Sequence, residues 1–233
     1  MVDADIEKAK RNAAKQALNF LGEASTIGVG TGSTVEKFID VLGEEKDGFK
    51  DRLFVASSYD TMLKLSKYRF KVLHPITIDR IDVYVDGADE VDKDLNMIKG
   101  GGAALTLEKI LTYYSMEKIF LVDYTKLVSK LGEKHPIPLD VLPYAVSFVY
   151  DLLIRKGYNP QIRRPTKGKY GPVVSDVGGI IIDIKPASFN PVALERELKS
   201  IPGIIETGLF IGLADKVIVG YPDKTSILSK ILK

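Results

Sequence analysis

An α/β fold is predicted for this chain of 233 residues by three observations. Short apolar runs that suit buried strands alternate with segments of helical periodicity, which is typical of a parallel sheet covered on both faces. Glycine-rich turns connect several of these strands and helices. After Lys130 the pattern changes to shorter strands and helices. We therefore expect a Rossmann-like parallel sheet with helices on both faces, plus a smaller α+β, ferredoxin-like subdomain.

The first half of the chain supplies most of the predicted sheet. Ala, Leu and Phe recur at helical spacing over residues 6–21, and the apolar run 25–30 precedes a helix that ends near Val41. The next expected elements are a strand at 53–56, a helix at 58–66, a strand at 83–85, a helix at 106–116 and a strand at 119–122. This alternation indicates βαβ units.

The segment after Lys130 predicts the smaller subdomain. The expected elements are a connection with prolines at 136, 138 and 143, a helix over 141–155, strands at 161–163, 173–174 and 180–184, and a helix over 192–199. The apolar run 214–219 is expected to return to the first sheet. We therefore assign 1–130 plus 207–233 to the Rossmann-like catalytic domain and 131–206 to a small domain that acts as a lid or in oligomerisation.

Composition excludes several kinds of site and partner. The chain has no cysteine, which excludes disulfides, thiolate metal sites and a cysteine nucleophile. Its two histidines, His74 and His135, lie too far apart in sequence for a histidine-pair metal motif. A net charge of +2 with interspersed signs does not favour nucleic acid as a partner. No apolar run suits a membrane span or a leader, so we expect a cytoplasmic protein without a membrane partner.

Three polar, glycine-rich segments are candidates for a ligand site, because parallel sheets bind ligands beyond the carboxyl ends of their strands. In the first, GlyThrGlySerThr (30–34), Gly30 and Gly32 permit a sharp turn before a helix. The N–H groups there attract an anion, with Ser33 and Thr34 as hydroxyl donors. Serine at 33 rules out the dinucleotide fingerprint, and no P-loop lysine follows. A plain turn capped by Ser33 is an equally good interpretation.

The other two segments carry the charged groups. Asp86, Asp89, Glu90 and Asp92 follow a predicted strand, and three interpretations stay open: a solvated acidic turn, a Mg²⁺ site, or acid–base chemistry on a polyol. In LysGlyGlyGly (99–102), three glycines suit a backbone that approaches a ligand. Lys99 is placed to neutralise a phosphate or a developing oxyanion, and Glu108 lies in the helix that follows.

Taken in order, these segments resemble the motifs of the type A ribose-5-phosphate isomerases. The similar stretches are 28–34, 57–61, 86–92, 99–109, 130–138 and 201–210, so the resemblance covers nearly the whole chain. The pair AspGlyAlaAsp and LysGlyGlyGly, with a glutamate at this spacing, is its most specific part. One departure is SerAspValGlyGly at 175–179, where the family commonly has a ThrAspAsnGlyAsn-like turn.

The resemblance implies interconversion of D-ribose 5-phosphate and D-ribulose 5-phosphate through an enediolate. It implies that Glu108 is the general base, that Asp86 assists ring opening, that Asp89 binds a hydroxyl and that Lys99 stabilises the enediolate oxygen. The implied substrate-binding residues are Thr31, Gly32, Ser33, Thr34, Gly87, Ala88, Gly100, Gly101, Gly102 and Lys126. No cofactor and no metal are expected. The family precedent is a homodimer or homotetramer, and the apolar Ile227, Leu228, Ile231 and Leu232 suit packing within or between subunits.

Other functions were weighed against this one. A non-catalytic sugar-phosphate sensor does not need Glu108, Lys99 and both aspartates. Such a sensor usually carries a DNA-binding helix-turn-helix, whereas the first 24 residues hold only one predicted helix. An aminosugar-phosphate isomerase–deaminase favours a catalytic histidine, which no glycine-rich segment holds. A CoA transferase needs a pantetheine channel that sequence does not reveal. A Mg²⁺-dependent phosphatase using Asp86 and Asp89 is distinguished by sensitivity to chelation.

Overall fold

The computed structural model describes residues 2–168 and 170–230, which divide into two compact units. The first unit contains the residues up to Ala88, Glu108–Leu127 and the residues from Leu213 onward. The second unit contains Asp89–Leu107 and Val128–Gly212. The predicted division differs from these units at 89–107, 128–130 and 207–212, all of which it assigns to the Rossmann-like domain. Residues 89–107 pack with the second unit because their two short strands pair with each other and with a strand from that unit.

A seven-stranded sheet forms the first unit, in the order β14-β13-β7-β4-β1-β2-β3. Neighbouring strands run parallel, except that β14 pairs antiparallel with β13. The strands are β1 Thr26–Val29, β2 Leu53–Ala56, β3 Lys71–Leu73, β4 Ile81–Gly87, β7 Ser115–Asp123, β13 Lys216–Gly220 and β14 Thr225–Ser229. The expected return of the last core strand to this sheet is confirmed by the pairing of β13 with β7.

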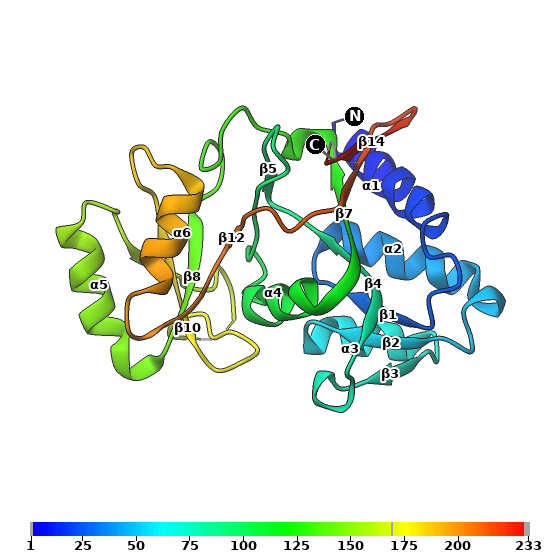
Figure 1. Ribbon diagram of the computed structural model, residues 1–233, viewed down its shortest axis with the longest axis horizontal. Coiled ribbons are helices and arrows are strands. Elements are labelled where there is room, and N and C mark those ends of the chain that lie inside the picture. The colour runs from blue at the N-terminus through cyan, green and yellow to red at the C-terminus, as the bar shows by residue number, and fades with distance from the viewer. Residues whose placement is uncertain (1, 169, 231–233) are drawn as a thin grey trace. The chain divides into compact units, whose positions relative to one another are not determined.

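Helices cover both faces of this sheet, as the periodicity predicts. On one face, α1 (Val2–Leu18) and α2 (Ser33–Glu44) pack against each other and on the central strands (Figure 1), and α3 (Tyr59–Lys67) adds Leu65 to the same core. On the other face, α4 (Leu105–Tyr114) packs Leu111 against Tyr84 of β4. Consecutive side chains of a strand point to opposite faces, so β4 contributes to both cores.

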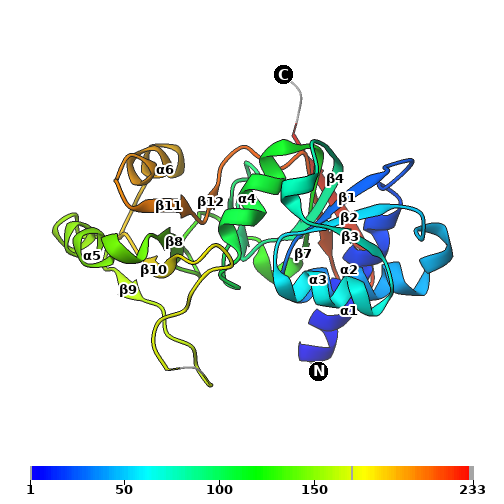
Figure 2. The same ribbon diagram turned by 90° about the horizontal axis from the view of Figure 1, so that it is seen from below.

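The second unit has a four-stranded sheet in the order β11-β8-β10-β9. Its strands are β8 Ile137–Val141, β9 Gln161–Ile162, β10 Ile180–Ile184 and β11 Ile204–Thr207, and the pairs are antiparallel. Helices α5 (Val146–Arg155) and α6 (Pro191–Lys199) pack their apolar residues against β8 and β10 (Figure 2). Three short strands form a separate sheet: β5 Glu90–Val91, β6 Met97–Ile98 and β12 Leu209–Phe210.

The prediction for 136–155 is wrong in its first part. The expected connection contains β8, every residue of which is buried, and α5 begins only at Val146. Pro138 has no N–H to donate, but it lies opposite Asp183 in the ladder and its carbonyl accepts the N–H of Gly208 (2.7 Å). The expected strand at 173–174 is an isolated bridge between Val174 and Ile180.

Smaller differences occur at element ends. The helix expected over 106–116 stops at Tyr114, because β7 begins at Ser115. In β14, Ile227 and Leu228 pair with β13 as part of the first unit, whereas Ile231 and Leu232 lie outside the described residues. None of the helices formed by residues 2–168 and 170–230 combines the length and the apolar character that crossing a bilayer requires.

Candidate active site

A group of buried polar residues lies on the α4 face of the first unit. Tyr84 and Asp86 are two residues apart on β4, so their side chains point to the same face. The Tyr84 hydroxyl donates to Asp86 Oδ2 (2.7 Å), and both residues are fully buried. Glu108 on α4, which covers this face, is 3% exposed, and its charge acts on Tyr84. The fold therefore gathers two candidate catalytic carboxylates around one phenol.

The first two glycines of GlyValGlyThrGly make room for this group. Gly28 is opposite Tyr84 in the β1–β4 ladder, and a Cβ at Gly28 would lie 2.6 Å from the Tyr84 ring. A Cβ at Gly30 would lie 1.8 Å from Asp86 Oδ1. Position 30 therefore requires glycine because the Asp86 carboxyl lies against its backbone. The third glycine, Gly32, has φ +135° and makes the turn. The sequence interpretation, in which Gly30 serves the turn, is corrected accordingly.

Gly30→Ala is expected to displace Asp86. The added methyl group overlaps the carboxyl and lies 2.5 Å from Asp86 Cβ, so the aspartate must move as a whole. We expect a loss of about 1–3 kcal/mol in the free energy of unfolding and a severe loss of turnover. Thermal unfolding and an isomerase assay measure both. Gly48→Ala is the matched control, since a Cβ there meets nothing within 4 Å; equal behaviour of the two variants contradicts the packing argument.

Burial and charge keep Tyr84 protonated. Desolvation raises the pKa of Tyr84 well above its usual value of 10, and the negative charges of Asp86 and Glu108 act in the same direction. The hydroxyl therefore stays a hydrogen-bond donor to Asp86. The other Asp86 oxygen, Oδ1, accepts the N–H groups of Gly87 (2.7 Å) and Thr31 (3.1 Å). Asp86 is held rigidly as an acceptor by three donors.

Tyr84→Phe gives a pH-dependent test of this arrangement. At pH 8 we expect the variant to be less stable by about 1–3 kcal/mol, because buried Asp86 loses a donor. Above pH 10 the tyrosine ionises in the unfolded chain, whereas Tyr84 in the folded protein stays protonated. The free energy of unfolding of the wild type therefore falls by about 1.4 kcal/mol per pH unit through this group. The stability gap should therefore narrow between pH 10 and 11, as followed by chemical denaturation. A gap that stays constant contradicts the raised pKa.

A cluster of hydroxyl groups adjoins Asp86 at the carboxyl ends of β1 and β2. Thr31 Oγ1 lies 2.9 Å from Ser57 Oγ and donates to Ser58 Oγ (2.7 Å). Thr61 Oγ1, 3.2 Å from Thr31 Oγ1, donates to the carbonyl of Gly30 (2.6 Å). Of the four hydroxyl residues, Thr31 alone is among the substrate-binding residues that the resemblance implies. Ser57, Ser58 and Thr61 lie in the stretch 57–61, which is one of the motifs that carry the resemblance. That motif could have identified them as site residues.

The start of α2 is exposed beside this cluster. Gly32 is the N-cap, without a side-chain cap, and Ser33 is the first helical residue. The alternative in which Ser33 caps the helix is therefore wrong. Gly32 and Ser33 are exposed, and Thr34 is buried. An exposed, uncapped helix N-terminus offers N–H groups to an anion. Lys126, at the end of the short helix η3 (Tyr124–Lys126), is half-buried in the same unit.

The second unit holds the other predicted residues. Lys99 is 2% exposed, its N–H donates to the carbonyl of Gly208 (2.9 Å), and its Nζ lies 5.3 Å from the centre of the Phe210 ring. Asp89 Oδ2 accepts the N–H of Gly101 (2.9 Å). Gly100, with φ +104°, begins a turn closed by the N–H of Ala103 on its carbonyl (3.0 Å). Gly101 and Gly102 are exposed.

Two of the carboxylates in the acidic stretch 86–92, Glu90 and Asp92, bind backbone N–H groups. Fully buried Glu90 accepts the N–H groups of Gly132, Lys134 and His135 at 2.6–2.7 Å, so it organises a loop. Asp92 accepts the N–H groups of Asp94 and Asn96 in a turn. Within the described part of the chain, no three His, Asp or Glu side chains are grouped so as to hold a metal ion. Because Asp86, Glu90 and Asp92 are buried, the stretch does not form a solvated acidic turn.

The predicted site residues fall into two groups. Thr31, Asp86 and Glu108 lie in the first unit, with Gly32, Ser33, Thr34, Gly87, Ala88 and Lys126. Asp89 and Lys99 lie in the second unit, with Gly100, Gly101 and Gly102. The chain passes between the units at Ala88–Asp89 and at Leu107–Glu108, within the two motifs that carry most of the resemblance.

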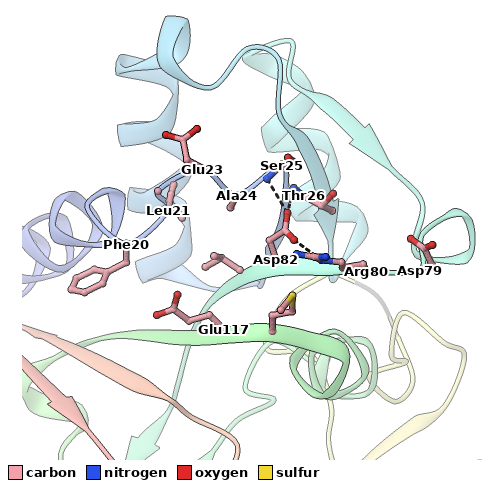
Figure 3. A pocket seen from close by; sticks show the side chains of 13 residues that line it. Phe20, Leu21, Glu23, Ala24, Ser25, Thr26, Asp79, Arg80, Asp82 and Glu117 are labelled. Carbon is pink, nitrogen blue, oxygen red and sulfur yellow. Dashed lines mark hydrogen bonds and ion pairs between the residues drawn. The ribbon is translucent and has the colours of Figure 1, made fainter.

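A cavity of about 850 Å³ lies at the opposite, amino-terminal edge of the large sheet (Figure 3). Part of its polar lining is paired: Asp82 accepts the N–H groups of Ser25 (2.8 Å) and Thr26 (3.0 Å) and the Nε–H of Arg80 (2.8 Å). Glu117, also in the lining, pairs with Lys216. None of the predicted site residues lines this cavity.

Comparisons with known proteins agree with the sequence resemblance. Residues 53–224 match the family model of ribose 5-phosphate isomerase A (phosphoriboisomerase A). Ribose-5-phosphate isomerase A of Methanococcus aeolicus is 41% identical over 98% of this chain and 97% of its own length. The protein of that name from Pyrococcus horikoshii is 43% identical over 93% of this chain and 95% of its own length.

Comparison with solved structures finds similar folds among ribose 5-phosphate isomerases. A D-ribose-5-phosphate isomerase in complex with phospho-erythronic acid superposes with a TM-score of 0.92 at 41% identity, covering 97% of this chain and all of that one. Ribose 5-phosphate isomerase A of Methanocaldococcus jannaschii gives 0.90 at 37% identity, covering 96% and 99%. The fold and these relationships define an isomerase enzyme. The chain belongs to the ribose 5-phosphate isomerase A family, which confirms the resemblance and the predicted fold class.

Proposed function

We propose that this enzyme interconverts D-ribose 5-phosphate and D-ribulose 5-phosphate through an enediolate, with Glu108 as the general base. The carrying observation is the buried group on the α4 face, where Glu108 is 3% exposed and its charge acts on the phenol that binds Asp86. A carboxylate sheltered from water suits the transfer of a proton to and from carbon. The membership of the family and the names of the relatives support the substrate.

Binding of the phosphate is assigned to the first unit. The exposed start of α2 and the half-buried Lys126 supply N–H groups and a positive charge, which together suit a dianion. The Thr31 hydroxyl, surrounded by Ser57, Ser58 and Thr61, is oriented by its neighbours. In the second unit, the exposed glycines 101 and 102 allow the sugar to approach the backbone.

The chemical steps are assigned as follows. Asp86 assists opening of the furanose ring by accepting the proton of the anomeric hydroxyl and passing it to the ring oxygen as the bond between that oxygen and C1 breaks. Asp89 binds a sugar hydroxyl. Glu108 then removes the proton from C2, and electron density moves onto the carbonyl oxygen at C1 to form the enediolate. Lys99 stabilises that oxygen. Glu108 returns the proton to C1 while the proton of the C2 hydroxyl moves to the C1 oxygen and C2 becomes the ketone, so atoms and electrons balance without an oxidant.

The oligomeric state and the compartment stay predictions. We propose a homodimer or homotetramer, and large exposed apolar side chains in each unit support self-association: Tyr113, Tyr114 and Met116 in the first and Tyr144 and Phe148 in the second. Light scattering after gel filtration gives the mass directly, and a monomer of 25.7 kDa contradicts the proposal. The cytoplasm is the expected compartment.

The test of the function is conversion of ribose 5-phosphate followed by NMR in D₂O, with and without a chelator. We expect rapid appearance of ribulose 5-phosphate, deuterium entering at the exchanged carbon, and no effect of chelation. A shielded base can return the same proton, so low deuterium content with full conversion is also compatible. Folded protein that binds the sugar phosphate without converting it favours the sensor. Loss of turnover on chelation contradicts the metal-free mechanism.

A further inference from the structure

In the second unit, the glycine loop that follows Lys99 is held from outside by one arginine. Arg163, directly after β9, donates from a single guanidinium nitrogen to the carbonyl oxygens of Gly100 (2.7 Å) and Gly101 (3.0 Å). No motif in the sequence predicts a role for Arg163. Its side chain is 17% exposed, and its contact with the Gly100 carbonyl is partly buried.

The guanidinium is itself fixed in place. Asp183 on β10 accepts from Nε (2.8 Å) and from the second terminal nitrogen (2.5 Å), which is a two-point ion pair. The backbone of Arg163 is tied to the sheet as well: its N–H donates to Ile181 (2.9 Å) and its carbonyl accepts from Val173 (2.8 Å). The side chain and the backbone of Arg163 are therefore both fixed, and its remaining guanidinium nitrogen, Nη1, donates to the loop.

The glycines need such a restraint. Glycine peptide planes rotate more freely than any others, and Gly100 has φ +104°. Arg163 holds the two carbonyl oxygens, while the N–H of Gly101 donates to Asp89 (2.9 Å). The loop is thus restrained through its carbonyls by a cation and through an N–H by a carboxylate. Rotation of the peptide plane between Gly100 and Gly101 would break contacts on both sides at once.

We infer that Arg163, oriented by Asp183, is a positioning residue that fixes the glycine loop 100–101 and thereby aligns Asp89 and Lys99 for the reaction. The inference rests on the proposed function for its catalytic consequence. A small misplacement of a reacting group costs a large factor in rate. Lysine is a poor substitute, since one ammonium group cannot bind both Asp183 and the two carbonyls in the same geometry.

The experiment compares Arg163→Ala, Arg163→Lys and Asp183→Asn with the wild type. We expect kcat for ribose 5-phosphate to fall about tenfold to hundredfold in Arg163→Ala, with smaller falls in the other two. Millimolar guanidinium chloride should restore part of the kcat of Arg163→Ala, whereas equal sodium chloride should not. Arg164→Ala is the matched control, because that neighbouring arginine is exposed. Unchanged kcat and KM in Arg163→Ala, or a fall explained by its unfolded fraction, overturns the inference.

A second measurement does not depend on activity. Amide hydrogen exchange at Gly101 and Ala103, whose N–H groups are bonded in the loop, should accelerate at least tenfold in folded Arg163→Ala, while exchange in β1 of the first unit is unchanged. If the wild type does not convert ribose 5-phosphate, the proposed function fails and the exchange result still decides the role of Arg163. Unchanged exchange at both amides overturns the inference.

Discussion

Glu108→Gln is expected to lower kcat for ribose 5-phosphate by about 10²–10⁴. The amide has the size of the carboxylate and keeps the packing of α4, but it cannot accept a proton from carbon. KM should change little, because the proposed role of Glu108 lies in the transition state rather than in binding. NMR in D₂O with chelator present measures conversion and deuterium incorporation together.

The control for this prediction is Glu45→Gln. Glu45 is an exposed glutamate of the first unit and follows directly after α2. We expect wild-type turnover from this variant, which shows that loss of one negative charge is harmless in itself. If turnover survives in Glu108→Gln, the isomerase activity stands but another group must be the base.

Lys99→Met is expected to lower kcat by about 10²–10³. Methionine keeps much of the apolar stem of Lys99, which is 2% exposed and lies over the Phe210 ring, but it removes the positive charge. In the proposed mechanism that charge stabilises an enediolate oxygen that becomes fully negative only during the reaction, so we expect the loss in kcat. Initial rates over a range of substrate concentrations separate kcat from KM.

This experiment also decides between the two roles that the sequence leaves open for Lys99. A raised KM with unchanged kcat would mean that Lys99 neutralises the phosphate, and the enediolate assignment would be wrong. Lys93→Met is the control, since Lys93 is 81% exposed and is paired weakly with neighbouring Asp94. Thermal unfolding of both variants checks that the buried position tolerates methionine.

Local sequence pattern was enough to predict the fold class and the order of the elements in the first unit. Strands 26–29 and 53–56 and helices 33–44 and 59–67 agree with the expected ones to within a few residues. This was possible because each buried strand is a short apolar run and each helix an amphipathic one, so the local pattern carries the information. Among the site residues, the motifs identified Asp86 and Glu108, both of which the structure places in one buried group.

Strand β8 shows where local pattern was insufficient. Pro136, Pro138 and Pro143 indicate a connection, because proline cannot donate to a ladder. The strand forms nevertheless, since it lies between β10 and β11 in the sheet, all its residues are buried, and the carbonyl of Pro138 still accepts a hydrogen bond from the N–H of Gly208. Tertiary burial outweighed the local preference.

The roles of the glycines and of their polar neighbours follow from contacts in the folded structure. The sequence predicts a turn role for Gly30, yet its lack of a side chain allows the close approach of Asp86, which lies far away in the sequence on β4. Tyr84 and Arg163 carry no motif of their own. Their roles arise from a shared strand face in one case and from a sheet register in the other. Contacts between residues far apart in sequence depend on packing and ladder register, which no local pattern records.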